Sequence, residues 1–338
     1  MNLPRLAVIG CGAISRLAHL PALVRHPGMR EHLVLVDRSP EQAREVSEEF
    51  EVRRVTTDHG AVIDEVDGAI IAVPPKYHAE IALDFIRRGK PVFVEKPLAM
   101  SAGEAEEMVQ AAEGAGVSVA VNNNRRLLPS LRMTRDLVQD GRLGGLQRIE
   151  WYEGAPFGWP LASGGLFGRA GAGRGVLQDL GSHVLDTLAW WLGGTPTVRN
   201  YLDDSMGGTE AMCRLEFEYR GCEGVLQLSW LSNLSDQFRI EGEDGHLRGD
   251  IRAWDHITLR DPRGRTRKLK LNRELPNPQA LRNRMMDNFL EVISNGAKPI
   301  VPAREVLPSL NLMDTCYRRR AQFEMPWMTT EGVEYAFG

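Results

Sequence analysis

This sequence of 338 residues lacks the features that would assign it to a membrane, secreted or zinc-binding class. No run of about 18 apolar residues is present, so no segment is expected to cross a membrane. The amino terminus lacks the basic-then-apolar pattern of a signal peptide. The four cysteines include no C-x-x-C pair, which fits free thiols rather than disulfides or a zinc site. We therefore expect a cytoplasmic protein without a metal.

An excess of charge of one sign is also missing. Lys and Arg number 41 and Asp and Glu number 45, which gives a formal net charge of −4 at pH 7. This balance gives no reason to expect nucleic acid or a membrane surface as a partner. A chain of 338 residues favours two domains, because single hydrophobic cores stop growing at about 250–300 residues.

The first third of the chain alternates short apolar segments with segments of helical pattern. One helix is expected to begin at a Ser-x-x-Glu capping box, Ser101 and Glu104, and another to end at Gly89. We predict β-strands at residues 6–9, 32–36, 68–73, 92–95 and 117–121. Such alternation is typical of a doubly wound parallel α/β sheet, the Rossmann fold. It predicts a first domain over residues 1–122 and a second over residues 123–338.

A glycine-rich turn follows the first predicted strand at once. The segment after residue 9 reads G-x-G-x-x-S, close to the fingerprint of dinucleotide-binding folds but with Ser15 at the third glycine position. The first glycine permits a tight turn and the second lets a pyrophosphate approach the backbone, while the third position needs only a small side chain. The helix that follows would direct its free amide groups at the phosphates. We expect the pyrophosphate of a nicotinamide dinucleotide to bind at Gly10, Gly12, Ala13 and Ile14.

An acidic residue ends the second predicted strand. Asp37 lies 22 residues after Ser15, where a carboxylate that binds the adenosine ribose is expected. A carboxylate there accepts hydrogen bonds from the 2′-hydroxyl and repels a 2′-phosphate, which favours NAD and leaves NADP open. Arg38 could stack on the adenine or weaken that preference. The alternative is that Asp37 is only the N-cap of the next helix.

The strand at residues 92–95 ends in an acid, a base and a proline. Pro97 has no amide hydrogen and cannot extend the sheet, so Glu95 and Lys96 lie at the carboxyl end of the strand. Ligands of open α/β sheets bind at that edge. A partly desolvated Lys96 could act there as an acid or a hydrogen-bond donor. The alternative is an ordinary charged pair in solvent.

A helix predicted at residues 179–192 carries polar side chains along one stripe. Asp179, His183 and Asp186 are spaced i, i+4, i+7 and lie on one face. A histidine suits proton transfer with an alcohol, and Asp179 could orient it. The alternatives are a solvated face with Asp179 as N-cap, or a metal site, which no further ligand supports.

The second half of the chain has a different pattern. A glycine-rich stretch at residues 154–175 contains Trp159 and forms either one wall of a substrate pocket or a surface loop. Period-2 alternation then predicts a mostly antiparallel sheet, with flanking helices at residues 279–295 and 303–321. The fold class is therefore α/β followed by α+β, with an open sheet face suited to oligomer formation. Strands are expected at residues 146–152, 197–203, 211–219, 224–231, 237–241, 246–251, 256–260 and 265–271.

These segments together resemble the glucose–fructose oxidoreductase / inositol dehydrogenase / MocA family of NAD(P)-dependent sugar and cyclitol oxidoreductases. Glu-Lys-Pro alone is common, but Glu-Lys-Pro at a strand end with Asp-x-x-x-His about 80 residues later is far more specific. The resemblance covers nearly the whole chain. The matching segments are Gly10-Cys11-Gly12, His19-x-Pro21-Ala22-Leu23, Val73-Pro74-Pro75-x-x-His78, Gly89-Lys90-Pro91-Val92-x-Val94-Glu95-Lys96-Pro97, Asn124-Arg125-Arg126 and Gln178-Asp179-Leu180-Gly181-Ser182-His183.

The resemblance implies an NAD(P)-dependent dehydrogenase or reductase that interconverts a secondary alcohol and a ketone on a sugar, a nucleotide-activated sugar or a cyclitol. In this family the lysine of Glu-Lys-Pro, the aspartate and the histidine converge beside the nicotinamide, which implies catalytic roles for Lys96, Asp179 and His183. It also implies a homodimer or homotetramer formed through the second domain. The further residues expected at the cofactor are Val73, Pro74, His78, Glu95 and Lys96. Those expected at the substrate are Asn124, Arg126, Trp159, Asp179 and His183.

Two other functions are compatible with the same fold. One is a non-catalytic NAD(P)-sensing protein, which the presence of Lys96, Asp179 and His183 disfavours. The other is an enzyme that cleaves glycosides by transient oxidation and recycles NAD. Sequence also leaves open whether Lys96 or His183 carries the proton.

Overall fold

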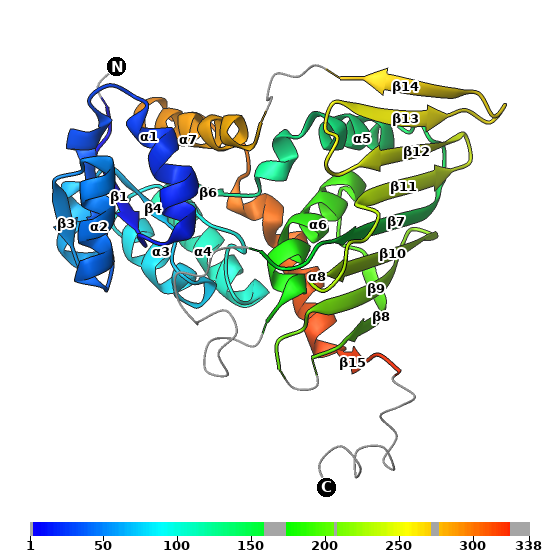
Figure 1. Cartoon of the computed structure of the whole chain (residues 1–338), viewed down its shortest axis with the longest axis horizontal. Helices are drawn as coiled ribbons and strands as arrows, with labels where there is room; N and C mark the ends of the chain where they lie inside the picture. The colour runs from blue at the N-terminus through cyan, green and yellow to red at the C-terminus, as the bar shows by residue number, and fades with distance from the viewer. Residues whose placement is uncertain (1–2, 159–173, 206–207, 272–276, 325–338) are drawn as a thin grey trace, which may run out of the picture.

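In the computed structural model, the chain forms two lobes side by side (Figure 1). The structure describes residues 3–158, 174–205, 208–271 and 277–324. The first lobe contains a six-stranded parallel sheet in the order β3-β2-β1-β4-β5-β6, which confirms the predicted Rossmann fold. Its strands are β1 (Leu6–Ile9), β2 (Leu33–Val36), β3 (Arg54–Thr56), β4 (Gly68–Ile71), β5 (Val92–Val94) and β6 (Val119–Val121).

Every residue of the five strands other than β3 is buried, as expected of parallel strands covered on both faces by helices. β3 is the edge strand, and two of its three residues are exposed. The helical segments of this lobe are η1 (Ser15–His19), α1 (Leu20–Val24), η2 (Met29–His32), α2 (Pro40–Phe50), η3 (Gly60–Glu65), η4 (Pro75–Tyr77), α3 (His78–Ile86) and α4 (Ala102–Ala115).

Two helix starts in this lobe can be compared with the sequence. The capping box at Ser101 and Glu104 is present, with both reciprocal hydrogen bonds formed. Helix α2 is capped by Ser39, whose hydroxyl accepts a hydrogen bond from the amide of Gln42 at 3.2 Å. Asp37 is therefore not the N-cap of α2, and its carboxylate is used elsewhere.

The second lobe is built on a nine-stranded mixed sheet in the order β14-β13-β12-β11-β7-β10-β9-β8-β15. Most neighbours run antiparallel, as predicted, but β10 is parallel to β7 and β15 is parallel to β8. The strands are β7 (Leu146–Gly154), β8 (Thr197–Asp203), β9 (Met212–Tyr219), β10 (Cys222–Ser229), β11 (Gln237–Gly242), β12 (Gly245–Asp250), β13 (His256–Arg260), β14 (Thr266–Lys270) and β15 (Ala321–Gln322). The remaining helical segments are η5 (Asn124–Leu127), α5 (Pro129–Gln139), α6 (Val176–Leu192), α7 (Pro278–Asn295) and α8 (Ala303–Arg318).

Helices α5, α6 and α8 cover one face of this sheet, and no helix of the described residues lies on the opposite face (Figure 1). Aromatic rings fill the core between the covered face and α6. The ring of Trp191 on α6 lies 4.9 Å from that of Phe238 on β11 and 5.4 Å from that of Trp151 on β7, measured between centroids. This packing fixes α6 against the sheet, with its amino-terminal end toward the first lobe.

The end of the chain returns to the first lobe. Helix α7 packs against α1, with the ring of Phe289 5.6 Å from that of Phe93 on β5. Beyond α7, the carbonyl of Val301 accepts a hydrogen bond from the amide of Val121, at the β6 edge of the parallel sheet. The segment that contains α7 therefore belongs to the first lobe in space, although it follows the second lobe in sequence.

Among the described residues, no helix is both long and apolar enough to span a bilayer. The same part of the chain contains no cluster of three or more His, Cys, Asp or Glu side chains arranged to bind a metal ion.

Candidate active site

The glycine turn has the geometry that its sequence requires. Gly10 has a φ of 95°, and a Cβ at this position would lie 2.4 Å from the carbonyl oxygen of Ala72. The hydroxyl of Ser15 donates to the carbonyl of Gly10 at 2.5 Å and holds the turn closed. A Cβ on Gly12 would meet nothing within 4 Å, so the backbone there is open to an approaching group. Ala13 and Ile14 lie half-buried in the first helical turn, where a pyrophosphate would meet free amide groups.

The carboxylate of Asp37 lies beside this turn. One oxygen accepts from the amide of Cys11 at 2.8 Å and the other from the amide of Ser39 at 2.9 Å. Both bonds fix the carboxylate at the end of β2, next to the glycine turn, and Arg38 is exposed beside it. The arrangement fits a dinucleotide whose ribose hydroxyls reach the remaining lone pairs of Asp37.

The residues after β4 form the next part of the sheet edge. Val73 is half-buried and Pro74 exposed, whereas His78 is fully buried. The two ring nitrogens of His78 lie 2.9 Å from the carbonyl of Val73 and 2.8 Å from that of Pro97. Burial lowers the pKa of His78, so its ring is uncharged at neutral pH. His78 ties together the chain segments that follow β4 and β5.

The buried carboxylate of Glu95 has two side-chain partners. Its Oε1 accepts from the Nε2 of His19 at 2.7 Å and from the Nδ2 of Asn122 at 2.6 Å, while Oε2 accepts from the amide of Lys96 at 3.2 Å. Burial alone would raise the pKa of Glu95, but the hydrogen bonds and charges of its partners outweigh burial and lower it. Sequence reasoning assigned no partner to Glu95. The available signals were His19 in the family motif and Asn122 at the end of the β6 strand.

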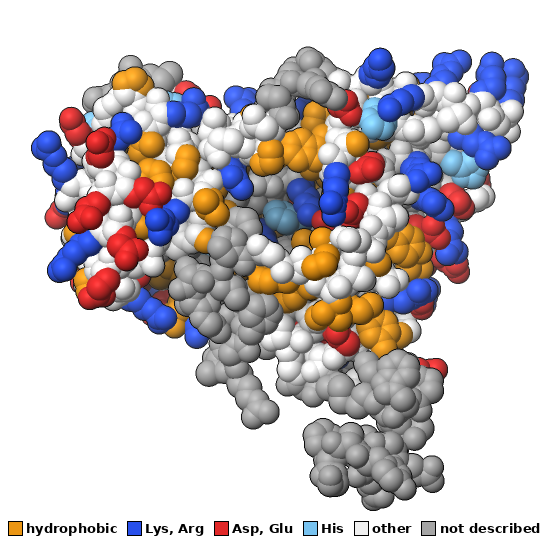
Figure 2. Space-filling view, viewed as in Figure 1, with side chains coloured by type: hydrophobic (Ala, Val, Ile, Leu, Met, Phe, Trp, Pro, Cys, Tyr) orange, Lys and Arg blue, Asp and Glu red, His pale blue; other side chains and the backbone are white. Residues whose placement is uncertain are grey.

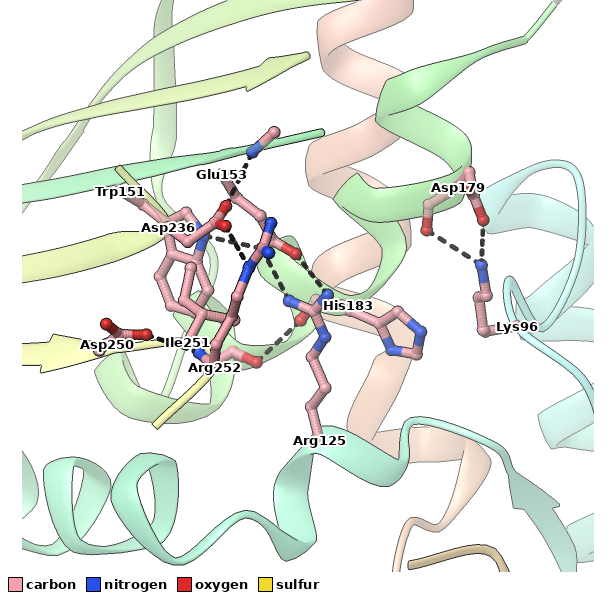
Figure 3. Close-up of polar contacts among 12 residues, drawn as sticks. Lys96, Arg125, Trp151, Glu153, Asp179, His183, Asp236, Asp250, Ile251 and Arg252 are labelled. Carbon is pink, nitrogen blue, oxygen red and sulfur yellow. Dashed lines mark hydrogen bonds and ion pairs between the residues drawn. The ribbon is translucent and has the colours of Figure 1, made fainter. Parts of the chain in front are cut away.

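Lys96 and Asp179 join the two lobes. The Nζ of Lys96, at the end of β5, donates to the Oδ1 of Asp179 at 2.5 Å and to the carbonyl of Asp179 at 3.1 Å. The Lys96 side chain is 19% exposed and that of Asp179, in the first turn of α6, is 35% exposed. Figure 3 shows Asp179 directed at Lys96, away from the ring of His183. The acid therefore positions the lysine, and not the histidine as the helical spacing had suggested.

His183 lies one turn further along α6 and is half-buried. Its Nδ1 is buried without a hydrogen-bond partner. Burial, followed by the positive charges of Arg125 and Lys96, lowers the pKa of His183 well below its usual value. An uncharged imidazole in this position can accept a proton. Figure 2 shows the surface hollowed between the two lobes, with basic side chains gathered in the hollow.

The three residues of the Asn124-Arg125-Arg126 segment have different environments. Asn124 and Arg125 are half-buried and line a recess together with Trp254 and Arg282. Arg126 is only 4% exposed and binds both carboxylate oxygens of the buried Asp186, at 2.9 and 2.7 Å. A contact between Arg126 and substrate would require this ion pair to open, so Arg125 is better placed than Arg126 for such a contact. Asp186 does not lie on a solvated face.

Trp159, predicted near the substrate, lies outside the described residues. Arg174 lies in the described part of the chain and stacks on the ring of Tyr317 at 4.6 Å from the centroid. Its guanidinium also donates to the carbonyl of Met100. These contacts hold the Arg174 side chain between α8 and the first lobe.

The amino terminus of α6 has a carboxylate partner that sequence reasoning missed. The Oε1 of Glu210, just before β9, accepts from the amides of Gly175 at 2.8 Å and Leu177 at 3.2 Å. Glu210 also accepts from the hydroxyl of Tyr317 at 2.8 Å and from the guanidinium of Arg320 at 2.9 Å. Since α6 has no side-chain cap of its own at Gly175, Glu210 supplies the acceptor that this helix end needs.

Two family models match successive parts of the chain. Residues 4–123 match the family model described as "Oxidoreductase family, NAD-binding Rossmann fold". Residues 131–248 match the C-terminal domain of the same glucose–fructose oxidoreductase / inositol dehydrogenase / MocA family. The chain belongs to this family. Several relatives are named dehydrogenases or reductases, and the family model that matches the first domain is described as NAD-binding.

Several relatives align over only part of this chain. The rhizopine catabolism protein MocA of Rhizobium meliloti is 34% identical over 136 residues, which cover 39% of this chain and 40% of that protein. The levoglucosan dehydrogenase of Pseudarthrobacter phenanthrenivorans is 27% identical over 215 residues, or 59% of this chain and 53% of the dehydrogenase. The chain thus aligns with about half the length of these relatives, which leaves the substrate to be proposed.

Solved structures share the fold over nearly the whole length of this chain. A 3-ketoreductase from Actinomadura kijaniata, solved with NADP and TDP-benzene, superposes with a TM-score of 0.80 at 21% identity and covers 96% of this chain and 100% of that one. At this level of identity the comparison shows a common fold.

Proposed function

We propose that this protein is an NAD(P)-dependent oxidoreductase that interconverts a secondary alcohol and a ketone on a sugar, a sugar derivative or a cyclitol. The observation that carries the proposal is the meeting of Lys96 and Asp179, from different lobes, beside the uncharged His183. All three lie at the carboxyl edge of a sheet whose glycine turn fits a dinucleotide. The arginines around the recess are compatible with a nucleotide-activated sugar.

His183, Lys96 and Asp179 have different roles in the proposed reaction. When bound, the nicotinamide supplies the acceptor or donor of a hydride. His183, uncharged at neutral pH, takes the proton of the substrate hydroxyl. The ammonium of Lys96, held by Asp179, stabilises the negative charge that develops on the same oxygen. In ketone reduction the same groups return the proton to that oxygen.

We propose NAD rather than NADP as the preferred cofactor. Both oxygens of Asp37 are fixed by backbone amides, so the carboxylate cannot easily turn away from the position of the ribose. A 2′-phosphate there would meet a negative charge. Substitution of Asp37 with serine is expected to weaken NAD binding and to narrow or reverse the preference over NADP, measured as the ratio of the two dissociation constants.

The proposed reaction is tested with a panel of sugars and cyclitols, followed by nicotinamide absorbance. Lys96→Met and His183→Gln are expected to lower turnover at least about 100-fold, because each removes a group that acts on the reacting oxygen. NAD binding, measured by calorimetry, should change little in His183→Gln. Lys268→Met, which removes an exposed lysine of β14, is the matched control and should retain full turnover.

Other outcomes of this experiment would replace the proposal. Full turnover in both active-site variants would exclude the assigned roles. Tight NAD binding without an absorbance change on any alcohol or ketone would favour the non-catalytic, cofactor-sensing function. Release of an aglycone from glycosides with no net formation of NADH would favour glycoside cleavage with cofactor recycling.

We further propose that the protein forms a homodimer or homotetramer through the helix-free face of the nine-stranded sheet. That face carries charged pairs on the two strands that flank β10, Arg148 with Glu150 on β7 and Arg214 with Glu216 on β9. An open sheet face of this kind can pair with a copy of itself about a two-fold axis. Light scattering should give the mass of two or four chains, and a monomer at micromolar concentration would contradict the assignment.

We also propose the cytoplasm as the place of action. All four cysteines are free and buried. Burial raises the pKa of Cys316 to about 12, and burial together with the nearby Asp37 raises that of Cys11 to about 12, so neither thiol readily forms the reactive thiolate. Cell fractionation should recover the protein with cytoplasmic markers.

A further inference from the structure

Arg125 is held in one orientation by a buried carboxylate. Its two terminal nitrogens donate to the two carboxylate oxygens of Glu153 on β7 at 2.8 and 2.6 Å, a bidentate pair. The indole nitrogen of Trp151 donates to the same carboxylate at 3.1 Å. The Arg125 side chain is 16% exposed and that of Glu153 is 10% exposed, so little solvent is available to replace these bonds.

The guanidinium held in this way lies beside His183. Figure 3 shows Arg125 rising from η5 between Glu153 and the imidazole ring, with Lys96 on the other side of the ring. Two cations from different segments therefore flank His183. Its buried Nδ1 has no acceptor to which a protonated ring could donate a hydrogen bond.

The carboxylates around His183 each form an ion pair with another residue. On α6, Asp179 binds Lys96, and Asp186 binds the buried guanidinium of Arg126, which also reaches Glu305 on α8. Beyond Glu153, the carboxylate of Asp236 pairs with Arg252. The carboxylates nearest the imidazole thus each have a cationic partner, and none is bonded to His183.

We propose that Arg125, fixed by Glu153, acts through His183 by keeping its ring unprotonated at neutral pH, ready to accept the substrate proton. This role rests on the proposed function, in which His183 is the proton acceptor. Burial of the ring also disfavours its protonated form, and the positive charge of Arg125 adds to this effect of burial. Glu153 fixes the orientation of Arg125 through the bidentate ion pair. Glu153 is therefore also a positioning residue, which acts on His183 through Arg125.

The test follows the protonation of the His183 ring directly, by NMR titration of histidine-labelled protein in the absence of substrate. His183→Gln assigns the signal. The double variant Arg125→Met/Glu153→Gln removes the cation without leaving a buried unpaired carboxylate, and the amide introduced at position 153 can still accept from Trp151. We expect the midpoint of the His183 titration to rise by about one pH unit or more. Arg125→Lys, which keeps the charge, should change the midpoint much less.

The matched control removes a second Arg–Glu pair from the same strand. Arg148 and Glu150 form an ion pair at 2.8 Å, and Glu150 points to the opposite side of β7 from Glu153 because their positions differ by an odd number. Arg148→Met/Glu150→Gln should leave the His183 midpoint unchanged. If the first double variant does not fold, Arg125→Gln alone should give at least as large a rise, because the carboxylate of Glu153 then lacks its cationic partner and also favours a protonated ring.

An unchanged midpoint in both Arg125→Met/Glu153→Gln and Arg125→Gln would overturn the inference. An equal rise in the Arg148 control would also overturn it, since the effect would then be general. Because this titration requires no substrate, it is independent of the sugar panel. A rise in the midpoint with no turnover on any alcohol would support the electrostatic role of Arg125 and reject the proposed reaction.

Discussion

The buried carboxylate of Glu95 connects three segments of the first lobe. It joins His19 on η1 to Asn122 after β6 and accepts from the backbone amide that follows it. Buried charges are tolerated when they are paired and hydrogen-bonded, and Glu95 satisfies both conditions. Its position directly before Lys96 means that this cluster also fixes the backbone from which the lysine projects.

Glu95→Gln is expected to lower the free energy of unfolding by about 1–3 kcal/mol at about pH 7, because an amide replaces a charged acceptor. Since the pKa of Glu95 is lowered in the folded protein, the stabilisation by its carboxylate is present above the unfolded pKa and is lost as pH falls through the folded pKa. The difference between wild type and variant, measured by urea unfolding, should therefore shrink as the pH falls below the ordinary glutamate pKa of 4.5. The exposed Glu48→Gln is the control and should change stability by less than about 0.5 kcal/mol. A difference that grows in acid would contradict this account of Glu95.

Helix α6 depends on a residue far from it in sequence. Glu210 accepts hydrogen bonds from two amides at the start of α6, and a Cβ at Gly175 would lie 1.9 Å from the Glu210 carbonyl oxygen. Only glycine therefore allows this close approach. Because Asp179 and His183 lie in the first two turns, the place of the helix end determines where both side chains point.

Glu210→Ala is expected to lower kcat about tenfold or more and the free energy of unfolding by about 1–3 kcal/mol, since two helix amides lose their acceptor. The amide introduced at position 210 by Glu210→Gln keeps an oxygen that can accept from the two helix amides. Glu210→Gln should therefore recover most of the turnover. Tyr317→Phe, which removes one hydrogen bond to Glu210 and none from α6, is the control. An equal loss of turnover in Glu210→Ala and Glu210→Gln would show that turnover does not depend on the hydrogen-bond acceptor at the start of α6.

The two lobes are coupled by the returning end of the chain. Phe289 on α7 is 1% exposed and contacts Phe93 within the first lobe, while α8 packs on both α4 and α6. A segment that belongs to both lobes makes independent unfolding of either one costly. The ion pair between Lys96 and Asp179 spans the same boundary.

Phe289→Ala is expected to cost about 3–5 kcal/mol, the usual range for removal of a buried aromatic ring. We expect calorimetry to show one transition shifted to lower temperature, because the lobes unfold together. Leu17→Ala, at a side chain 46% exposed, should shift the transition little. A variant with two separate transitions, only one of them shifted, would argue that the lobes are not coupled.

Sequence patterns were sufficient for the elements that are defined locally. The glycine turn, the strand that ends at Lys96 and the capping box at Ser101 each depend on neighbouring residues, and the structure has them in place. Helix α6 begins at Val176, three residues before the predicted start, because its cap comes from Glu210. Strand β3 was missed because its exposed side chains give no apolar pattern.

The partners within the site could not be predicted from sequence. Lys96 and Asp179 are 83 residues apart, and His19 lies 76 residues from Glu95. Spacing along one helix suggested that Asp179 serves His183, but a residue from another lobe binds Asp179 instead. Local spacing identifies which side chains share a face, whereas tertiary packing decides which of them meet.

The return of the chain to the first lobe has a consequence for protein synthesis. Domains usually fold in order as they leave the ribosome, the amino-terminal one first. Here the edge of the first sheet at Val121 is paired with Val301, and the ring of Phe93 packs on Phe289. The nascent first domain must therefore wait, with part of its core and one sheet edge uncovered, while the second domain is translated. Its final form is reached only after residues 278–302 emerge, which makes this interval the stage at which a chaperone would be of most use.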